Sequence, residues 1–240
     1  PKIAQARATW SRGAFVGNHQ HDAHEAFGAL MERCDQVDVN AAQHLNLPEL
    51  KANGGTNHCR YSTPFWKAFG GIQLSKTTCH ACGHIHAQYE IWNCLSLPVP
   101  DEDASIEQLL KNYWGTEPLQ DETDKCEQRD CLALRQRSKN LSLERWPNTL
   151  CLHLKRWKVV SLLPFRQVKR YVEVSFEMVL PVEPMQSSYH LLGVVVHHGH
   201  AGGGHYTAFV KTNKTWTHFN DSQVQRNIPC LLYTSPSPRD

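Results

Sequence analysis

The spacing of apolar residues predicts an amphipathic helix that opens near Gln20. Asp22 and Glu25 stand in its expected first turn, where the positive end of the helix dipole favours acidic side chains. The apolar positions recur every three or four residues, so they fall on one side of a helix. They are Ala23, Ala26, Phe27, Leu30, Met31 and Cys34. The polar stretch 41–56 has no sustained period and is expected to be a variable loop or a short helix.

Runs of strand-forming residues dominate the middle of the chain and predict a sheet-rich fold. An aromatic cluster at 65–69 leads into a strand ending near Leu74, and a further strand-rich stretch runs from Ile85 to Leu97. A second helix is then expected, with Ser105 as its cap and one apolar face. Later strands are predicted at 150–157, 172–176 and 189–196. The apolar face of the helix consists of Ile106, Leu109, Leu110, Tyr113 and Trp114.

The last predicted hairpin carries the clearest candidate chemistry. The glycines 202–204 feed a strand that begins with His205, and Asn213-Lys214 is the expected tip of a hairpin. A return strand at 215–219 would bring Asn220 back towards His205. A histidine that acts as a general base needs a polar neighbour to fix its ring, and Asn220 or Asp221 could accept from its second nitrogen. The alternative is that His205 is only a turn residue.

Composition describes an ordinary globular protein. The chain has 240 residues, 40% hydrophobic and 20% charged, enough for one large or two small domains. A net charge of +2 with no basic, aromatic-rich run indicates no nucleic-acid partner. No apolar stretch approaches the roughly 20 residues needed to span a bilayer, so no membrane partner is expected. We therefore expect an intracellular protein, cytoplasmic and/or nuclear.

Two cysteine pairs have the spacing of metal ligands. Cys79 and Cys82 flank a tight turn that Gly83 would permit, and Cys126 and Cys131 are the expected second pair. Four thiolates from two turns favour a closed, structural zinc site. Reduced cysteines without metal are the alternative, and a histidine at 80, 84 or 86 could replace one member of the second pair. The odd total of nine cysteines also favours a reducing compartment over a disulfide framework.

Both ends of the chain differ from the rest. The first residue is Pro1, and we expect an upstream portion to be missing. The stretch 230–240 is expected to be non-native sequence or a disordered tail.

Several blocks, in order, resemble the ubiquitin-specific proteases, papain-like cysteine peptidases that remove ubiquitin from proteins. Gly204-His205-Tyr206-Thr207-Ala208 and the run from Trp216 to Val224 are similar to the family's histidine box. The segment 20–25 resembles its Q-Q-D-A-H-E block, with His21 where a second glutamine is usual. The segments 95–100 and 146–157 resemble L-S-L-P-V/I-P and L-P-x-x-L-x-L-H-L-K-R-F. Ordered blocks are more specific than any single motif.

The resemblance implies an α+β, papain-like fold with thumb, palm and zinc-bearing fingers. It implies a partial catalytic domain at 1–229, truncated at the N-terminus and at the C-terminus, with fingers at roughly 72–135. Its implied chemistry is thiol-dependent hydrolysis after the C-terminal glycine of ubiquitin, and its implied partners are ubiquitin and ubiquitinated proteins. The implied catalytic residues are His205, Asn220 and Asp221; the implied substrate-binding residues are Asp22, Gly204 and Tyr206; the implied zinc ligands are Cys79, Cys82, Cys126 and Cys131.

The nucleophile that the resemblance requires is not visible in this sequence. The family's cysteine stands in a G-N-T-C-Y/W box ahead of the segment 20–25, whereas the first cysteine here is Cys34. The chain is therefore expected to be inactive by itself, while its parent protein is a cysteine-type deubiquitinase. One alternative is a ubiquitin-binding pseudoenzyme or scaffold. A nucleic-acid-binding zinc ribbon would fit the cysteine pairs but leaves the histidine box unexplained.

Overall fold

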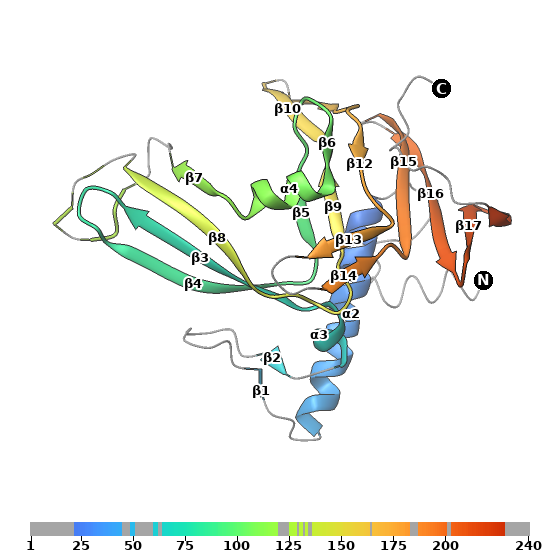
Figure 1. Ribbon diagram of the computed structural model, residues 1–240, viewed down its shortest axis with the longest axis horizontal. Helices are drawn as coiled ribbons and strands as arrows, with labels where there is room; N and C mark the ends of the chain where they lie inside the picture. Colours follow the sequence, from blue (N-terminus) through green and yellow to red (C-terminus); the bar gives the residue numbers. More distant parts are fainter. Residues whose placement is uncertain are drawn as a thin grey trace. The chain divides into compact units, whose positions relative to one another are not determined.

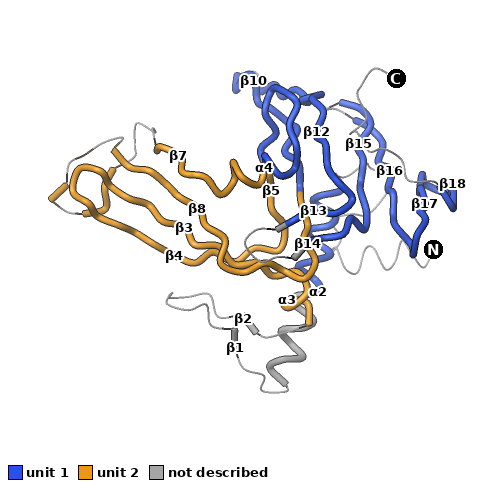
Figure 2. Tube along the Cα trace, viewed as in Figure 1, with its two compact units in different colours: residues 1–34, 98–109, 153–240 blue, residues 35–97, 110–152 orange. Residues whose placement is uncertain are grey.

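A computed structural model describes most of the chain as two compact units, coloured in Figure 2. Unit 1 comprises Pro1–Cys34, Pro98–Leu109 and His153–Asp240, and unit 2 comprises Asp35–Leu97 and Leu110–Leu152. The segments 1–21, 201–202 and 229–240 lie outside the described residues, so the expectations for Gln20, His21, Gly202 and the tail at 230–240 fall there. The described residues are 22–44, 49–50, 60–61, 64–119, 125–128, 130–131, 133, 136–163, 165–182, 187–200 and 203–228.

The first described helix, α2 (Ala23–His44), has Glu25 in its first turn as predicted, whereas Asp22 precedes the helix. The Oδ1 of Asp22 accepts hydrogen bonds from the backbone N–H groups of His24 at 2.8 Å and Glu25 at 3.2 Å, as an N-cap does. Met31 is buried, but Leu30 is 42% exposed, so the predicted apolar face is only partly covered. The helix also continues to His44, into the stretch where a loop or short helix was expected.

Unit 1 contains a four-stranded antiparallel sheet in the order β15-β16-β17-β18, which Figure 1 shows at the red end of the colour scale. The predicted tip at Asn213 is confirmed, since this residue has the left-handed φ of 58° that tight hairpin turns favour. Trp216 is fully buried and Thr207 is nearly so. The strands are β15 (Gly193–His200), β16 (Gly203–Thr212), β17 (Thr215–Asn220) and β18 (Gln223–Ile228).

The prediction of one strand over 189–196 is wrong, because the chain forms two strands there. The backbone N–H of Leu191 donates to the carbonyl of Met178 at 2.9 Å, which closes the β13–β14 hairpin before β15 starts. The residues 197–199 then continue β15, although a loop was expected. The smaller strands of unit 1 are β6 (Ala104–Ser105), β10 (Trp157–Leu162), β11 (Phe165–Lys169), β12 (Val174–Ser175), β13 (Val179–Val182) and β14 (Ser187–His190). Among them β10 pairs with β11, β6 with β12, and β13 with β14.

Unit 2 is built on a second sheet in the order β4-β3-β8-β7. The central strand β3 pairs antiparallel with both β4 and β8, and it buries Gln73, Ser75 and Cys79 along its length. Gln73 donates to the Oε2 of Glu90 at 2.8 Å across the β3–β4 ladder. The elements are β1 (Glu49–Leu50), β2 (Arg60–Tyr61), α3 (Pro64–Phe69), β3 (Gly71–Cys79), β4 (Ile85–Trp92), β7 (Thr116–Leu119) and β8 (Arg137–Arg145).

Three further elements connect the units in sequence: β5 (Leu95–Pro98), α4 (Ile106–Tyr113) and β9 (Leu152–Lys155). The predicted cap of α4 is confirmed, because the Oγ of Ser105 accepts from the backbone N–H of Gln108 at 3.2 Å. Ile106, Leu109 and Leu110 are buried as the helical pattern predicts. None of the described helices is both long and apolar enough to cross a membrane.

Candidate functional site

Strands β16 and β17 bring His205 and Asn220 into direct contact. The Nε2 of His205 lies 2.6 Å from the Oδ1 of Asn220, which ends β17. An amide oxygen can only accept, so Nε2 carries the proton and Nδ1 is left as the acceptor nitrogen of a neutral ring. The side chain of His205 is 42% exposed, so a reacting group can reach it. This arrangement has the geometry of a general base held by an orienting partner.

Asp221 lies further from the histidine than Asn220 does. Its Oδ2 is 4.0 Å from the Nε2 of His205, and its side chain is 82% exposed. The residue has a φ of 51° in the turn between β17 and β18, a left-handed position that aspartate tolerates better than most residues. The geometry therefore assigns the contact with His205 to Asn220, and Asp221 can influence the ring only through a screened charge.

A second pair, Asp22 and Tyr206, joins the start of α2 to β16. The Tyr206 hydroxyl donates to the Oδ2 of Asp22 at 2.9 Å. Burial opposes ionisation of Asp22, but hydrogen bonds from Tyr206 and from the N–H groups of Glu25 and His24 outweigh it, so the pKa of Asp22 lies below its usual range. Burial and the bond to Asp22 raise the pKa of Tyr206 to about 12. At neutral pH the pair is thus one carboxylate held by one neutral phenol.

Gly204 is required by close packing. A Cβ at this position would overlap the Nε2 of His197 and the carbonyl oxygen of His198. Both contacts would be far inside van der Waals distance, and one of them is to backbone, so even alanine would displace β15. Gly204 therefore sets how closely β15 and β16 approach beside His205.

The four predicted cysteine ligands in unit 2 form one cluster. Their sulfur atoms all lie within 4.8 Å of one another; Cys79 and Cys131 are 3.9 Å apart, and Cys82 and Cys126 are 3.6 Å apart. A tetrahedral ion with metal–sulfur bonds of about 2.3 Å would place its ligands about 3.8 Å apart. The donor set therefore fits zinc, and the cluster could bind a metal.

The turn around Cys79 favours the thiolate form that a metal needs. Gly83 has a φ of 73°, as the predicted knuckle requires, and its N–H donates to the carbonyl of Cys79 at 2.9 Å. Backbone N–H groups, that of Cys82 foremost, lower the pKa of Cys79 to about 7 despite its burial. His80 contacts the Oγ of Ser138 at 2.9 Å. No histidine belongs to the cluster among the described residues.

Two further cysteines, Cys94 and Cys151, are poor candidates for a nucleophile. Burial, with a smaller effect of Cys151, raises the pKa of Cys94 to about 12, and burial also raises the pKa of Cys151. A nucleophilic cysteine reacts as its thiolate, which a raised pKa disfavours. Both thiols are half-buried, and we assign them a role in packing.

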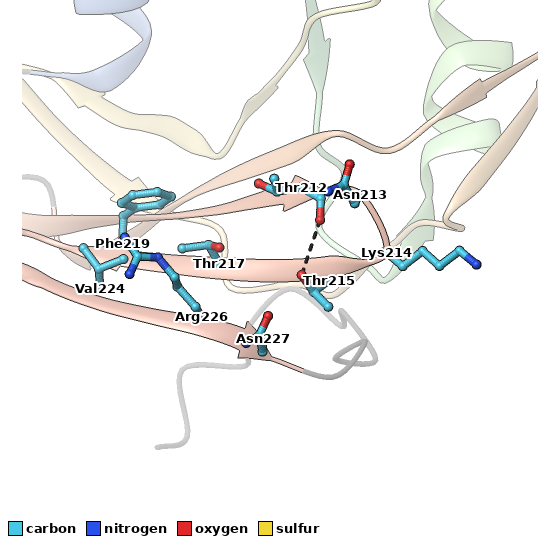
Figure 3. A pocket seen from close by; sticks show the side chains of 9 residues that line it. All are labelled: Thr212, Asn213, Lys214, Thr215, Thr217, Phe219, Val224, Arg226 and Asn227. Carbon is cyan, nitrogen blue, oxygen red and sulfur yellow. Dashed lines mark hydrogen bonds between the residues drawn. The ribbon is translucent and has the colours of Figure 1, made fainter.

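An open hollow of about 720 Å³ lies on β16–β18 (Figure 3), and none of the predicted site residues lines it. The side chains of Phe219 and Val224 line one end of it, and Lys214 lines the hollow near the β16–β17 turn. The hydroxyl of Thr215 donates to the carbonyl of Thr212 at 3.3 Å beside it. The hollow is thus separate from the contact between His205 and Asn220. Its lining is completed by Asn213, Thr217, Arg226 and Asn227.

A stacked histidine pair, not predicted from the sequence, adjoins Asp22. The rings of His24 on α2 and His153 on β9 lie 3.8 Å apart with an interplanar angle of 10°. Burial and the neighbouring charge of His24, with Lys155, lower the pKa of His153, although Asp22 acts in the opposite direction. A stack of two residues distant in sequence leaves no signal in local periodicity.

Because His153 is stacked and half-buried, we expect acid to destabilise unit 1. Because the pKa of His153 is lower in the folded chain than in the unfolded chain, folding favours the neutral ring. Neutral His153 therefore stabilises the fold above the ordinary histidine pKa of about 6.5. This stabilisation is lost as the pH falls from that value through the lower folded-state pKa. Urea unfolding at pH 7.5, 6.5 and 5.0 should show the free energy of unfolding falling less steeply for H153F than for the unchanged chain. His197 and His198, whose pKa values burial also lowers, titrate in both proteins and cancel in the difference. Equal slopes would contradict the prediction.

Comparison with known proteins gives concordant matches. A family model described as Ubiquitin carboxyl-terminal hydrolase matches residues 1–229. The chain is 34% identical over 249 residues to Ubiquitin carboxyl-terminal hydrolase 4 of Arabidopsis thaliana, covering 94% of this chain and 66% of that protein. It is 30% identical over 240 residues to Ubiquitin carboxyl-terminal hydrolase 3 of Homo sapiens, covering 88% of this chain and 46% of that one. The chain thus spans about half to two thirds of these relatives.

A solved structure matches the fold as well. The SAGA DUB module of Ubp8, Sgf11, Sus1 and Sgf73 bound to monoubiquitin aligns with a TM-score of 0.67 at 26% identity. The alignment covers 98% of this chain and 49% of the matched chain.

Proposed function

The chain belongs to the ubiquitin carboxyl-terminal hydrolase family, and we propose that it supplies the general base and the substrate-tail site of a cysteine-type deubiquitinase. Its fold is the α+β, papain-like fold of the ubiquitin-specific proteases. The substrate in this proposal is a protein joined to the C-terminal glycine of ubiquitin. We expect the protein to act inside the cell, where thiols stay reduced.

The observation that carries the proposal is the 2.6 Å contact between His205 and Asn220. With Nε2 bonded to Asn220, the Nδ1 of His205 can take the proton of a cysteine thiol. The thiolate attacks the carbonyl of the ubiquitin glycine, His205 returns the proton to the departing amine, and water then hydrolyses the thioester. Asn220 keeps the ring oriented and in the correct tautomer throughout.

Asp22, Tyr206 and Gly204 form the proposed site for the ubiquitin tail. The carboxylate of Asp22, already held by Tyr206, can accept hydrogen bonds from the N–H groups of an extended peptide. Gly204 keeps β15 and β16 close beside the base, because the His197 ring and the His198 carbonyl fill the space that a side chain there would need. These residues would place the last glycine within reach of His205.

The four-cysteine cluster is proposed to hold a structural zinc ion. The ion would tie the β3–β4 turn, through Cys79 and Cys82, to the segment that carries Cys126 and Cys131. Four protein ligands leave no open position, so the metal would stabilise unit 2 and take no part in hydrolysis.

The second candidate function is a ubiquitin-binding pseudoenzyme or scaffold. It needs no nucleophile and is supported by the contact between Tyr206 and Asp22, which belongs to the proposed binding site for the tail. Both functions predict that the 240-residue chain binds ubiquitin. They differ in whether the full-length protein has a cysteine in the family's G-N-T-C-Y/W box and hydrolyses ubiquitin conjugates.

We expect the purified 240-residue chain to bind ubiquitin without cleaving a ubiquitin-amide reporter. Y206F should weaken binding by roughly tenfold, since it removes a hydrogen bond to a charged group. Calorimetry measures the affinity, and reporter fluorescence measures cleavage. Y189F, on β14, is the matched control and should bind as the unchanged chain does.

Failure of the unchanged chain to bind ubiquitin would contradict the proposed function. Cleavage of the reporter that H205A abolishes would instead overturn the expectation that this chain is inactive by itself.

A further inference from the structure

Lys169, the last residue of β11, lies against the edge of β15. Its Nζ donates to the carbonyl oxygen of His197 at 2.6 Å and to that of Gly199 at 3.4 Å. These carbonyls are two residues apart on one strand, so they face the same edge. In the described sheet β15 is an end strand, and its outward carbonyls find a partner in this ammonium group.

The same ammonium group also fixes a side chain. Its Nζ lies 3.1 Å from the Nδ1 of His197, so Lys169 holds both the backbone and the ring of that residue. The rings of Trp157 and Tyr171 flank the ammonium at 5.9 and 5.7 Å from their centroids. Cation–π attraction to the two rings adds to the hydrogen bonds that hold the ammonium group.

His197 connects Lys169 to the proposed tail site. Its ring lies 4.7 Å from the ring of Tyr206 and 5.8 Å from that of Trp157, so it is held between them. Tyr206 in turn donates to Asp22 at 2.9 Å. The His197 ring also limits the space over Gly204, because a methyl group at that position would overlap its Nε2.

We propose that Lys169 is a positioning residue for the ubiquitin tail, which it serves by fixing His197 against Tyr206. The inference rests on the proposed function, because it concerns the same substrate site. A lysine that only stabilised the β15 edge would change folding stability and leave tail recognition alone. A positioning lysine instead changes the affinity for intact ubiquitin selectively.

The test compares two ligands on the same variants of the 240-residue chain. Calorimetry would measure binding of intact ubiquitin and of ubiquitin lacking its C-terminal tail. K169M should bind intact ubiquitin on the order of tenfold more weakly and tail-less ubiquitin as well as the unchanged chain does. K169R, which keeps a positive donor, should recover part of the loss. K158M is the matched control, because Lys158 is on the same hairpin and pairs with exposed Asp101.

The outcomes separate the inference from its premise. If the unchanged chain binds neither ligand, the proposed function fails. If the unchanged chain prefers intact ubiquitin and K169M keeps that preference, Lys169 has no positioning role and the inference is overturned. Thermal unfolding monitors the folded state of each variant, and K169Q replaces K169M in the same comparison if K169M does not fold.

Discussion

Replacing Cys79 by serine is expected to remove the metal from the chain and to unfold the sheet of unit 2. Cys79 is buried at the end of β3, and its sulfur lies 3.9 Å from that of Cys131. Structural zinc sites contribute folding free energy on the order of 10 kcal/mol in small domains, and a three-thiolate site loses much of it. The zinc content should fall from about one equivalent per chain to below half, and the free energy of unfolding should drop by several kcal/mol.

The matched control for this substitution is C34S. Cys34 is exposed on α2 and outside the cluster, so its variant should keep both the metal and the stability of the unchanged chain. A chelator should destabilise the unchanged chain and have little further effect on C79S. A full equivalent of zinc in C79S, or less than half an equivalent in the unchanged chain, would contradict the four-cysteine site.

Features set by local chemistry were predictable from the sequence. Gly83 supplies the left-handed turn of the cysteine knuckle, Asn213 supplies that of the β16–β17 hairpin, and Ser105 caps α4. In each case a single residue type satisfies a backbone requirement within a few positions along the chain. The cluster of four cysteines was predictable for a similar reason, since cysteines paired at short spacing are typical of structural metal sites.

Features set by contacts between distant segments were not predictable. From the sequence alone, Asn220 and Asp221 were equally good candidates for the partner of His205. Only the register of β17 and the turn at Asp221 decide which side chain reaches the ring. The contacts of Lys169 could not be predicted from the sequence either, since its partners on β15 lie 28 and 30 positions away along the chain. A lysine in a strand-rich segment is by default a solvated side chain.

The predicted element boundaries were wrong at two places, and strand pairing explains one of them. Residues 197–199 looked like a loop because they are polar and end in glycine, yet pairing with β16 extends β15 through them. The helix α2 likewise continues beyond the apolar pattern that predicts it and ends at His44. Propensity alone does not determine where such elements stop.

In the full-length protein, H205A is expected to abolish ubiquitin hydrolysis while leaving ubiquitin binding intact. A positioned general base contributes roughly 10²- to 10⁴-fold to the rate, and no other described side chain is hydrogen-bonded to Asn220 in its place. The loss should appear in kcat, measured with a ubiquitin-amide reporter, because the base acts in the transition state. H218A is the matched control: its ring stacks on Phe209 in the same sheet, and its variant should retain activity.

Substitutions at Asn220 and Asp221 distinguish a hydrogen bond that orients His205 from the effect of a nearby charge. N220A should lower kcat by roughly 10²-fold, since it frees the His205 ring to rotate and to change tautomer. D221A should have a small effect that weakens further at high salt, because its carboxylate is 4.0 Å from the ring and mostly exposed. If D221A instead proved the more damaging variant, the carboxylate would be the working partner of His205 and the observed contact with Asn220 would describe a resting arrangement. The ratio of the two kcat values therefore decides between the amide and the carboxylate.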